Sequence, residues 1–348
     1  MDSRERVFRA LERTQPDRLP IFQQLLPGAR LQYGARLDEL LGRYPSDFSD
    51  CGYYGDSEYG PAAGLGHRDA WGAVWTRVSD DYKGLVTEHP LEEWAALDTY
   101  VFPDPASVGD FSRVIATTRT NPGRKYLMAD GDTLFQRMFY LRGYENLMLD
   151  LAERRPEAAV LRDRIVEFML RRIEIWLGYG VDGLFFRDDW GTQQELMIRP
   201  ALWREFFKPS YRRLFEAVHG AGKHVFFHSD GVIAAIIPDL IEIGVDAINA
   251  QIPCMDAKRL AREFGATLCF VAGADRQYWL PFGTPREVET HCYQLADTFG
   301  RHNGGYIGGG EIGGDVPLEN AEAMLRTFAG YTYPRGLSRP HEVLLPST

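Results

Sequence analysis

Apolar positions along this chain recur with two different periods, and stretches of the two kinds alternate. From residue 125 onward, short apolar runs of strand length alternate with longer stretches in which apolar residues lie three and four positions apart, as in amphipathic helices. Strands separated by helices pair in parallel, because each crossover has to carry the chain back across the sheet. The predicted strands are RLPIF (18–22), KYLMAD (125–130), VDGLFFRDD (181–189), KHVFFHSD (223–230), VDAINAQ (245–251), TLCFVAGAD (267–275) and GGYIGGG (304–310).

These strands predict an α/β fold, a single (β/α)8 TIM barrel whose remaining strand is hidden in the N-terminal third of the chain. An open, doubly wound sheet is the alternative, since it is built from the same alternation. Residues 33–105 interrupt the pattern: they are rich in Gly, Asp, Tyr and Trp, and DAWGAVWTRV and KGLVTEHP predict a hairpin. We therefore expect one barrel domain over residues 1–348, with 33–105 as an irregular insertion.

Polar side chains follow the predicted strands at their carboxyl ends. In a barrel these ends lie on one face, where the active site is built. Taken alone, each such residue has the alternative interpretation of a loop carboxylate or a helix cap, and for Asp132 and Asp275 this is the favoured interpretation. The strand-end candidates are Asp130, Asp132, Asp188, Asp189, His228, Asp230, Gln251, Asp275 and Glu311.

His228 and Asp230 are the pair of residues best suited to metal binding or to acid-base catalysis. Residues two apart in a strand point to the same side, so these two side chains can contact the same atom or ion. Gly231, which has no side chain, leaves room for another group to approach closely. They could ligate a divalent metal, with Glu311 as a further ligand, or act as acid and base without one. A buried histidine bonded to an aspartate that caps the next helix is the structural alternative. Their position at a strand end favours a catalytic role.

A second polar cluster is FFRDDWGTQQ, at 185–194. Side chains alternate along a strand, so one of Asp188 and Asp189 faces the mouth of the barrel while the other braces the loop or pairs with Arg187. Asp189 is our candidate catalytic carboxylate. Trp190 is either a packing residue or a pocket wall, and Tyr278 is equally ambiguous. The predicted substrate-binding set is Asp130, Asp188, Trp190, Gln193, Gln251 and Tyr278.

The amino-acid composition and net charge limit the kinds of molecule that the protein is expected to bind. The 348 residues carry 39 Lys and Arg against 49 Asp and Glu, a formal net charge of -10. This balance disfavours nucleic acid and anionic lipid as partners. The four cysteines form no CxxC pair, so neither a disulfide framework nor a zinc knuckle is expected. A charged N-terminus and the lack of a long apolar window predict a soluble, cytoplasmic protein without a membrane span.

The stretch GGGEIG (308–313) matches the GxGxxG dinucleotide fingerprint, but its context does not. It belongs to the last strand-helix unit, a proline precedes the next helix, and no acidic residue stands at the end of a following strand. We interpret it as a loop whose glycines allow close approach of a ligand or of backbone.

Several blocks, taken in order, resemble a known family. They are ERVFRALERTQPDRLPIF (5–22), the segment from GVDGLFFRDDWG to KPSYRRL (180–214), HSDG (228–231) with LIEIGVDAINAQ (240–251), and GTPREV (283–288) with DVPLENAEAM (315–324). Together they are similar to the uroporphyrinogen decarboxylase superfamily, and more closely to its branch of cobalamin-linked methyltransferase-like proteins. The resemblance implies a single βα barrel with its site at the carboxyl ends of the strands.

Members of that methyltransferase branch typically carry His-x-Cys at this strand end and a further cysteine in the last loop, which bind zinc and activate a thiol. Here His228 matches the histidine, Asp230 stands at the first cysteine position, and the last loop has Glu311 and no cysteine. Nitrogen and oxygen ligands would favour a hydroxyl or water over a thiolate. Arg30 and Arg36 only loosely match the arginine-rich entry segment of the decarboxylase itself.

The primary hypothesis is a methyltransferase-like enzyme that moves a methyl group between a small molecule and a corrinoid, carried by a partner protein, or another acceptor. Zn²⁺ or another divalent metal at His228, Asp230 and Glu311 is the expected cofactor. One alternative is a decarboxylase or lyase that acts on a carboxylated small molecule through Asp189. Another is a non-catalytic subunit of a corrinoid methyltransferase system. The sequence leaves open whether the chain forms a homodimer.

Overall fold

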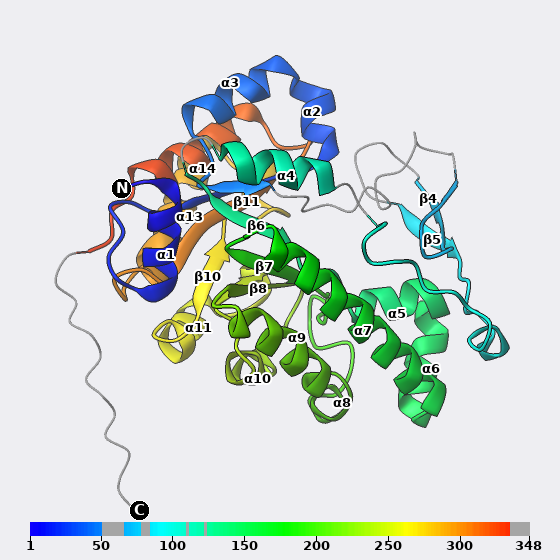
Figure 1. The fold of residues 1–348 in the computed structure, drawn as a ribbon. Helices are drawn as coiled ribbons and strands as arrows, with labels where there is room; N and C mark the ends of the chain where they lie inside the picture. The colour runs from blue at the N-terminus through cyan, green and yellow to red at the C-terminus, as the bar shows by residue number, and fades with distance from the viewer. Residues whose placement is uncertain (51–65, 78–83, 109–110, 122–123, 335–348) are drawn as a thin grey trace, which may run out of the picture.

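The computed structural model describes residues 1–50, 66–77, 84–108, 111–121 and 124–334, and eight of their strands form one parallel sheet (Figure 1). Its order is β1-β11-β10-β9-β8-β7-β6-β2. The two end strands meet where the backbone N of Asp47, next to β2, donates to the Ile21 carbonyl of β1 at 2.9 Å. The sheet thus curls into the predicted TIM barrel, and the open-sheet alternative is excluded. The strands are β1 (Ile21–Leu25), β2 (Phe48–Asp50), β6 (Tyr126–Asp130), β7 (Gly183–Arg187), β8 (His224–Ser229), β9 (Ala247–Ala250), β10 (Cys269–Ala272) and β11 (Tyr306–Ile312).

Helices surround the barrel, and α9 illustrates how they are held there (Figure 1). Its apolar residues Tyr211 and Phe215 lie on one face, and their rings contact Phe227 of β8 and Phe186 of β7 at centroid distances of 5.5 and 5.0 Å. The helices are α1 (Ser3–Glu12), α2 (Pro27–Tyr33), α3 (Ala35–Arg43), α4 (Phe111–Thr120), α5 (Phe135–Arg142), α6 (Tyr144–Glu153), α7 (Pro156–Gly178), α8 (Pro200–Phe206), α9 (Lys208–Gly220), α10 (Ile237–Glu242), α11 (Ala257–Phe264), α12 (Trp279–Phe282), α13 (Pro285–Phe299) and α14 (Leu318–Gly330). Over the described part of the chain, no helix combines the length and the apolar character that a membrane span requires.

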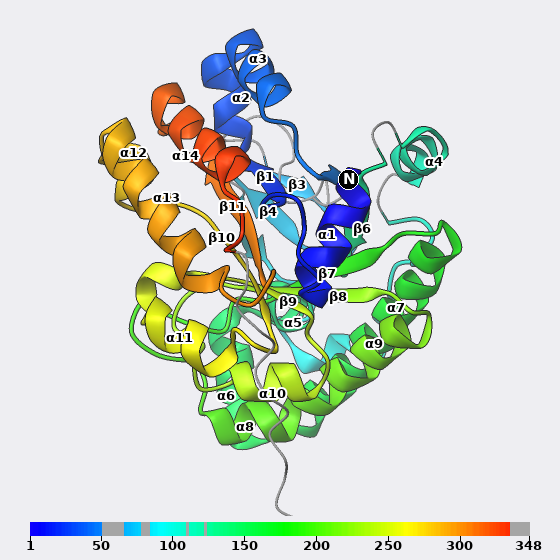
Figure 2. The same cartoon turned by 90° about the vertical axis from the view of Figure 1, so that its left-hand side faces the viewer.

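The amino-terminal end of the barrel is plugged by α1, which Figure 2 shows among the strands. The Asp2 side chain caps this helix by accepting a hydrogen bond from the Glu5 backbone N at 2.9 Å. Val7, Ala10 and Leu11 then fall on one helical face and join the apolar cluster of the barrel interior. Burial of a Val or Leu side chain contributes about 2 kcal/mol. Because α1 fills the amino-terminal end of the barrel, the carboxyl-terminal end is the one at which a binding site can form.

The glycine-rich stretch at 308–313 lies mostly within β11 and is not the loop that we predicted from sequence. A Cβ on Gly308 would come within 2.6 Å of the Phe328 ring, and one on Gly310 within 2.5 Å of the Met324 sulfur. Both neighbours belong to α14, so these glycines allow that helix to approach the strand closely. Their role is packing within the last strand-helix unit.

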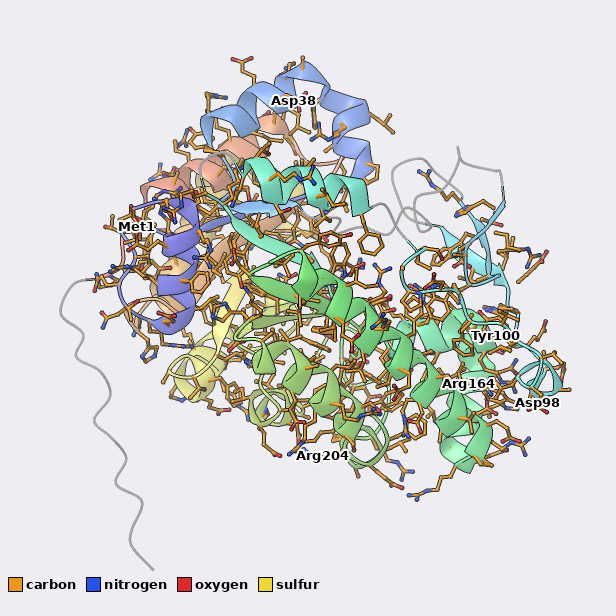
Figure 3. All side chains as sticks on the ribbon, in the orientation of Figure 1. Met1, Asp38, Asp98, Tyr100, Arg164 and Arg204 are labelled. Atoms are coloured by element: carbon orange, nitrogen blue, oxygen red, sulfur yellow. The ribbon has the colours of Figure 1, made fainter. Side chains whose placement is uncertain are left out.

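Residues 33–105 contain the strand that completes the barrel, β2, which lies in the N-terminal third as expected. They also form a small antiparallel sheet of β3 (His67–Arg68), β4 (Val74–Thr76) and β5 (Leu85–Glu88), which confirms the predicted hairpin pairing. Trp75 of β4 packs on Tyr140 of α5 at 4.8 Å between ring centroids. Figure 3 shows Tyr100 and Arg164 on this same side of the molecule.

Candidate active site

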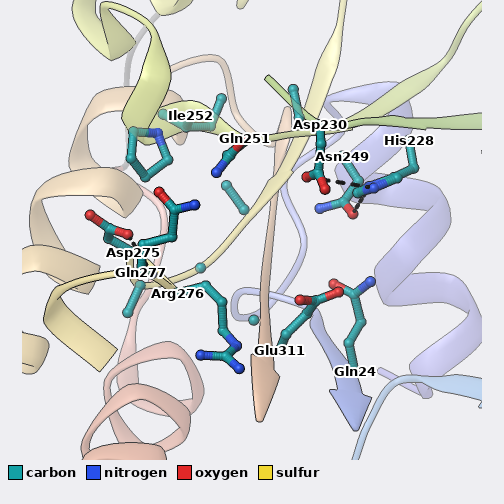
Figure 4. Close-up of a pocket in the computed structure, with 16 residues that line it drawn as sticks. Gln24, His228, Asp230, Asn249, Gln251, Ile252, Asp275, Arg276, Gln277 and Glu311 are labelled. Atoms are coloured by element: carbon teal, nitrogen blue, oxygen red, sulfur yellow. Dashed lines mark hydrogen bonds and ion pairs between the residues drawn. The ribbon is translucent and has the colours of Figure 1, made fainter. Parts of the chain in front are cut away.

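The inward-facing side chains change from apolar to polar near the carboxyl ends of the strands. On β8 and β9, Phe226 and Ala247 belong to the interior apolar cluster, and the next inward positions are His228 and Asn249. This end of a βα barrel is where active sites are built. A depression of about 90 Å³ opens there (Figure 4), and its polar lining residues are Gln24, His228, Asp230, Asn249, Gln251, Asp275, Arg276, Gln277 and Glu311.

The imidazole of His228 is held by Asn249. Its Nδ1 lies 2.8 Å from Oδ1 of Asn249, and Nδ2 of Asn249 donates to the Val271 carbonyl at 2.8 Å. The opposite ring nitrogen, Nε2, faces Asp189 and Asp230 in the mouth.

Asp189 is fixed by donors on both of its oxygens. Oδ1 accepts from the Asp230 backbone N at 2.9 Å, and Oδ2 accepts from Nε2 of Gln136 at 2.8 Å. The first of these bonds ties the end of β7 to the end of β8. It brings the carboxylates of Asp189 and Asp230 to the same side of the His228 ring.

Asp189, His228 and Asp230 form a cluster with the dimensions of a metal site. One ligand atom from each lies within 4.8 Å of the others. His228 Nε2 is 3.5 Å from Asp189 Oδ1 and 3.7 Å from Asp230 Oδ1. Two ligands bound to a tetrahedral ion at about 2.1 Å lie about 3.4 Å apart, a separation close to both distances from His228 Nε2. One imidazole and two carboxylates would leave a fourth position open, as in catalytic zinc sites.

The same carboxylates change the acidity of His228. Burial alone would lower its pKa, but the contact with Asp189 and the charges of Asp230 and Glu311 outweigh that effect and raise the pKa to about 9. The ring is therefore protonated at neutral pH when no cation is present. A metal ion would have to displace this proton, so binding would release it.

Glu311 stands apart from the cluster of Asp189, His228 and Asp230, although the sequence predicted it as a metal ligand. It lines another wall of the same depression (Figure 4). Among the described residues, none donates a hydrogen bond to its carboxylate or forms an ion pair with it. Burial raises its pKa, while the positive charges of His228 and Arg276 partly oppose the rise.

Gln193 and Gln251, both predicted to bind substrate, are joined at the rim. Oε1 of Gln251 accepts from the Gly231 backbone N at 2.9 Å and from Nε2 of Gln193 at 3.0 Å. The thiol of Cys254 donates to Oε1 of Gln193 at 3.0 Å. A backbone N–H can only donate, so these bonds fix which end of Gln251 is oxygen. Its Nε2 is left to donate into the depression.

A family model described as Uroporphyrinogen decarboxylase (URO-D) matches residues 78–331. The chain belongs to the uroporphyrinogen decarboxylase family. Among solved structures, it is similar in fold to a methyltransferase from Methanosarcina mazei, with a TM-score of 0.72 and 16% identity over 94% of this chain and 98% of that chain. A chitinase from Chromobacterium violaceum ATCC 12472 gives a TM-score of 0.38 at 11% identity over 90% and 99% of the two chains, too low to support an argument. No curated protein matches the sequence.

In this member of the uroporphyrinogen decarboxylase family, two predicted substrate-binding residues lie beneath the mouth. Asp188 is buried, and it accepts from the backbone N of Leu134 and Gln136 at 2.7 and 2.8 Å and from the Tyr211 hydroxyl at 2.6 Å. Burial raises its pKa to about 7 even though these hydrogen bonds oppose the rise. Trp190 is fully buried and stacks on Phe135 at 4.2 Å between ring centroids. Both therefore support the loop that carries Asp189.

Two other predicted substrate-binding residues lie outside the lining of the depression. Asp130 is buried in an ion pair with Arg187 at 2.9 Å, and its Oδ1 also accepts from the Asp132 backbone N at 3.0 Å. Tyr278 is 59% exposed at the start of α12. Neither lines the depression that His228 faces. Asp275, as the simpler interpretation held, caps a turn by accepting from the Gln277 backbone N at 2.8 Å.

Three further residues line the depression although the sequence did not point to them: Asn249, Gln24 and Arg276. Asn249 had a usable signal, because it lies two residues before Gln251 in an otherwise apolar strand and so shares its face. Gln24 lies in register with Glu311 across β1 and β11, which only the closure of the barrel reveals. Arg276 lies in the turn between β10 and α12, where strand alternation predicts no direction.

Proposed function

We propose that this chain is a metal-dependent, methyltransferase-like enzyme, which moves a methyl group between a small molecule and a corrinoid or another acceptor. The observation that carries the proposal is the convergence of His228 Nε2 with one oxygen each of Asp189 and Asp230 at the mouth of the barrel. Membership of the uroporphyrinogen decarboxylase family and the likeness in fold to a methyltransferase support the reaction class. A corrinoid would be delivered by a partner protein.

The nitrogen and oxygen ligand atoms of this cluster suit Zn²⁺ or a similar divalent ion. His228 would bind through Nε2, and Asp189 and Asp230 through one oxygen each. Such an ion supplies Lewis-acid activation of a hydroxyl or thiol group. Because two ligands are carboxylates and none is a cysteine, we infer that the acceptor or donor atom is oxygen more readily than sulfur.

When a hydroxyl group is the acceptor, methyl transfer breaks the bond between the methyl carbon and its donor atom, forms a bond from that carbon to the hydroxyl oxygen, and requires the hydroxyl proton to leave. Glu311 is suited to take that proton, since its carboxylate accepts no hydrogen bond from the described residues and its raised pKa brings it closer to neutrality. Gln251 is suited to orient the substrate, because its Nε2 can donate to an oxygen of the bound molecule. Gln193 would keep that amide in place.

Elemental analysis of the purified protein tests the metal part of the proposal. We expect close to one divalent ion per chain, lost in His228→Ala and retained in His302→Ala, a change outside the cluster of Asp189, His228 and Asp230. The transfer part is tested by incubating the protein with methylcobalamin and either alcohol or thiol acceptors, with demethylation followed by absorbance. We expect turnover in the wild type and in His302→Ala and none in His228→Ala. Metal-free protein with full turnover would refute the metal-dependent mechanism.

The same protein preparations distinguish the proposed methyltransferase from the two alternative functions, a decarboxylase or lyase and a non-catalytic subunit. Release of CO₂ from a carboxylated compound without a methyl acceptor would identify a decarboxylase or lyase. Tight association with a corrinoid protein, with no turnover and no effect of His228→Ala on flux through the complex, would identify a non-catalytic subunit.

A further inference from the structure

Chemistry alone decides which atom donates and which accepts in the two hydrogen bonds that Asn249 makes beside His228. The Val271 carbonyl can only accept, so the Asn249 atom 2.8 Å from it has to be the amide nitrogen, Nδ2. The other end of that side chain is therefore the oxygen, which can only accept. The ring atom that faces it at 2.8 Å, Nδ1 of His228, has to carry a hydrogen.

We propose that Asn249 is a positioning residue that fixes His228 with its hydrogen on Nδ1 and thereby reserves Nε2 for a divalent cation. The side chain of Asn249 hydrogen-bonds to the His228 ring and to the Val271 carbonyl, so its effect on the cation runs through the ring. The role of Asn249 in cation binding rests on the proposed function. The position of the ring hydrogen, in contrast, follows from the contacts of Asn249 alone.

The geometry explains why an asparagine suits this position. β9 places Asn249 beside His228 in register, and β10 supplies the Val271 carbonyl, so the amide bridges three neighbouring strands. A carbonyl or carboxylate that accepts from the non-coordinating nitrogen of a metal-binding histidine fixes the ring and its tautomer. An amide does so without adding a negative charge to a mouth that already contains Asp189, Asp230 and Glu311. A carboxylate at this position would add a further charge and make the proton on Nε2 harder to displace.

The experiment compares wild type, Asn249→Leu and Asn249→Asp, with circular dichroism to establish that each is folded. The first measurement is nitrogen NMR of ¹⁵N-histidine-labelled, chelator-treated protein at a pH above that at which His228 loses its charge, with His228→Gln used to assign the signal. We expect the hydrogen on Nδ1 in the wild type and in Asn249→Asp, and a mixture or the Nε2 form in Asn249→Leu. A wild-type signal with the hydrogen on Nε2 would overturn the inference.

The second measurement is the affinity for Zn²⁺, by competition with a chromophoric chelator. We expect Asn249→Leu to bind about 10- to 100-fold more weakly than wild type, and Asn249→Asp to restore most of the loss at alkaline pH. Equal affinity of wild type and Asn249→Leu would show that Asn249 does not position the ligand. If no form binds the ion while the wild type keeps its hydrogen on Nδ1, the proposed metal function fails and the assignment of the ring hydrogen holds. Should Asn249→Leu fail to fold, Asn249→Ala takes its place in both measurements.

Discussion

Asp188 and Asp189 are neighbours in the chain, yet their carboxylates face opposite sides of the end of β7. Asp188 accepts from the Tyr211 hydroxyl at 2.6 Å beneath the mouth, whereas Asp189 Oδ1 lies 3.5 Å from His228 Nε2 within it. Alternation along an extended chain produces this division, because successive side chains point to opposite faces. One residue supports the loop, and the other presents its carboxylate to His228 in the mouth.

Alanine substitutions should separate these two roles. In Asp188→Ala, three donors lose their buried acceptor, and we expect the free energy of unfolding to fall by about 3 kcal/mol. In Asp189→Ala, the partly exposed position of the side chain limits the loss to about 1 kcal/mol, while Zn²⁺ affinity should fall at least about 100-fold. Urea unfolding and chelator competition measure the two quantities. A larger loss of stability in Asp189→Ala than in Asp188→Ala would contradict the division.

Stability without metal should depend on pH through His228. Its pKa is about 9 in the folded protein, against 6.5 unperturbed. The raised value means that His228 stabilises the fold fully below pH about 6.5 and loses this contribution as pH rises through 9, up to about 3 kcal/mol. In chelator, urea unfolding of wild type should show this decline relative to His228→Gln. Parallel curves for the two proteins would show that the imidazolium does not stabilise the fold.

Gly231 should tolerate no side chain. Its φ is +74°, and a Cβ would come within 2.3 Å of the Gly191 carbonyl oxygen. The close approach that the sequence predicted at Gly231 is therefore made by the loop after β7. We expect Gly231→Ala to lower the free energy of unfolding by about 2 kcal/mol and to weaken Zn²⁺ binding, since Asp230 is adjacent. Gly178→Ala, in a helix with open space around it, is the matched control and should be neutral or stabilising.

Glu311→Gln should separate proton transfer from metal binding. The amide preserves shape but cannot take a proton, so we expect kcat to fall by about 10²- to 10⁴-fold with unchanged metal content. Steady-state kinetics with methylcobalamin and elemental analysis of the same sample provide the comparison. Loss of the metal in this variant would instead place Glu311 among the ligands, as the sequence first suggested.

The sequence determined the architecture because local patterns carry it. Apolar runs of strand length separated by amphipathic helices require parallel pairing, and seven of the eight barrel strands were predicted from this alternation. The eighth, β2, spans three residues, too few for any period to be visible. The placement of polar residues at the strand ends followed from the same alternation and drew attention to His228, Asp230 and Asp189.

Tertiary structure alone decided which of those residues meet. Strand pairing set Asp189 beside His228, closure of the barrel set Glu311 on another wall, and register across β8, β9 and β10 made Asn249 the partner of the imidazole. Distances between residues far apart in the chain depend on twist, register and loop geometry, which side-chain periodicity along one strand does not specify. The sequence therefore determined which end of the barrel carries the polar groups, and the folded backbone determined which of them lie close together.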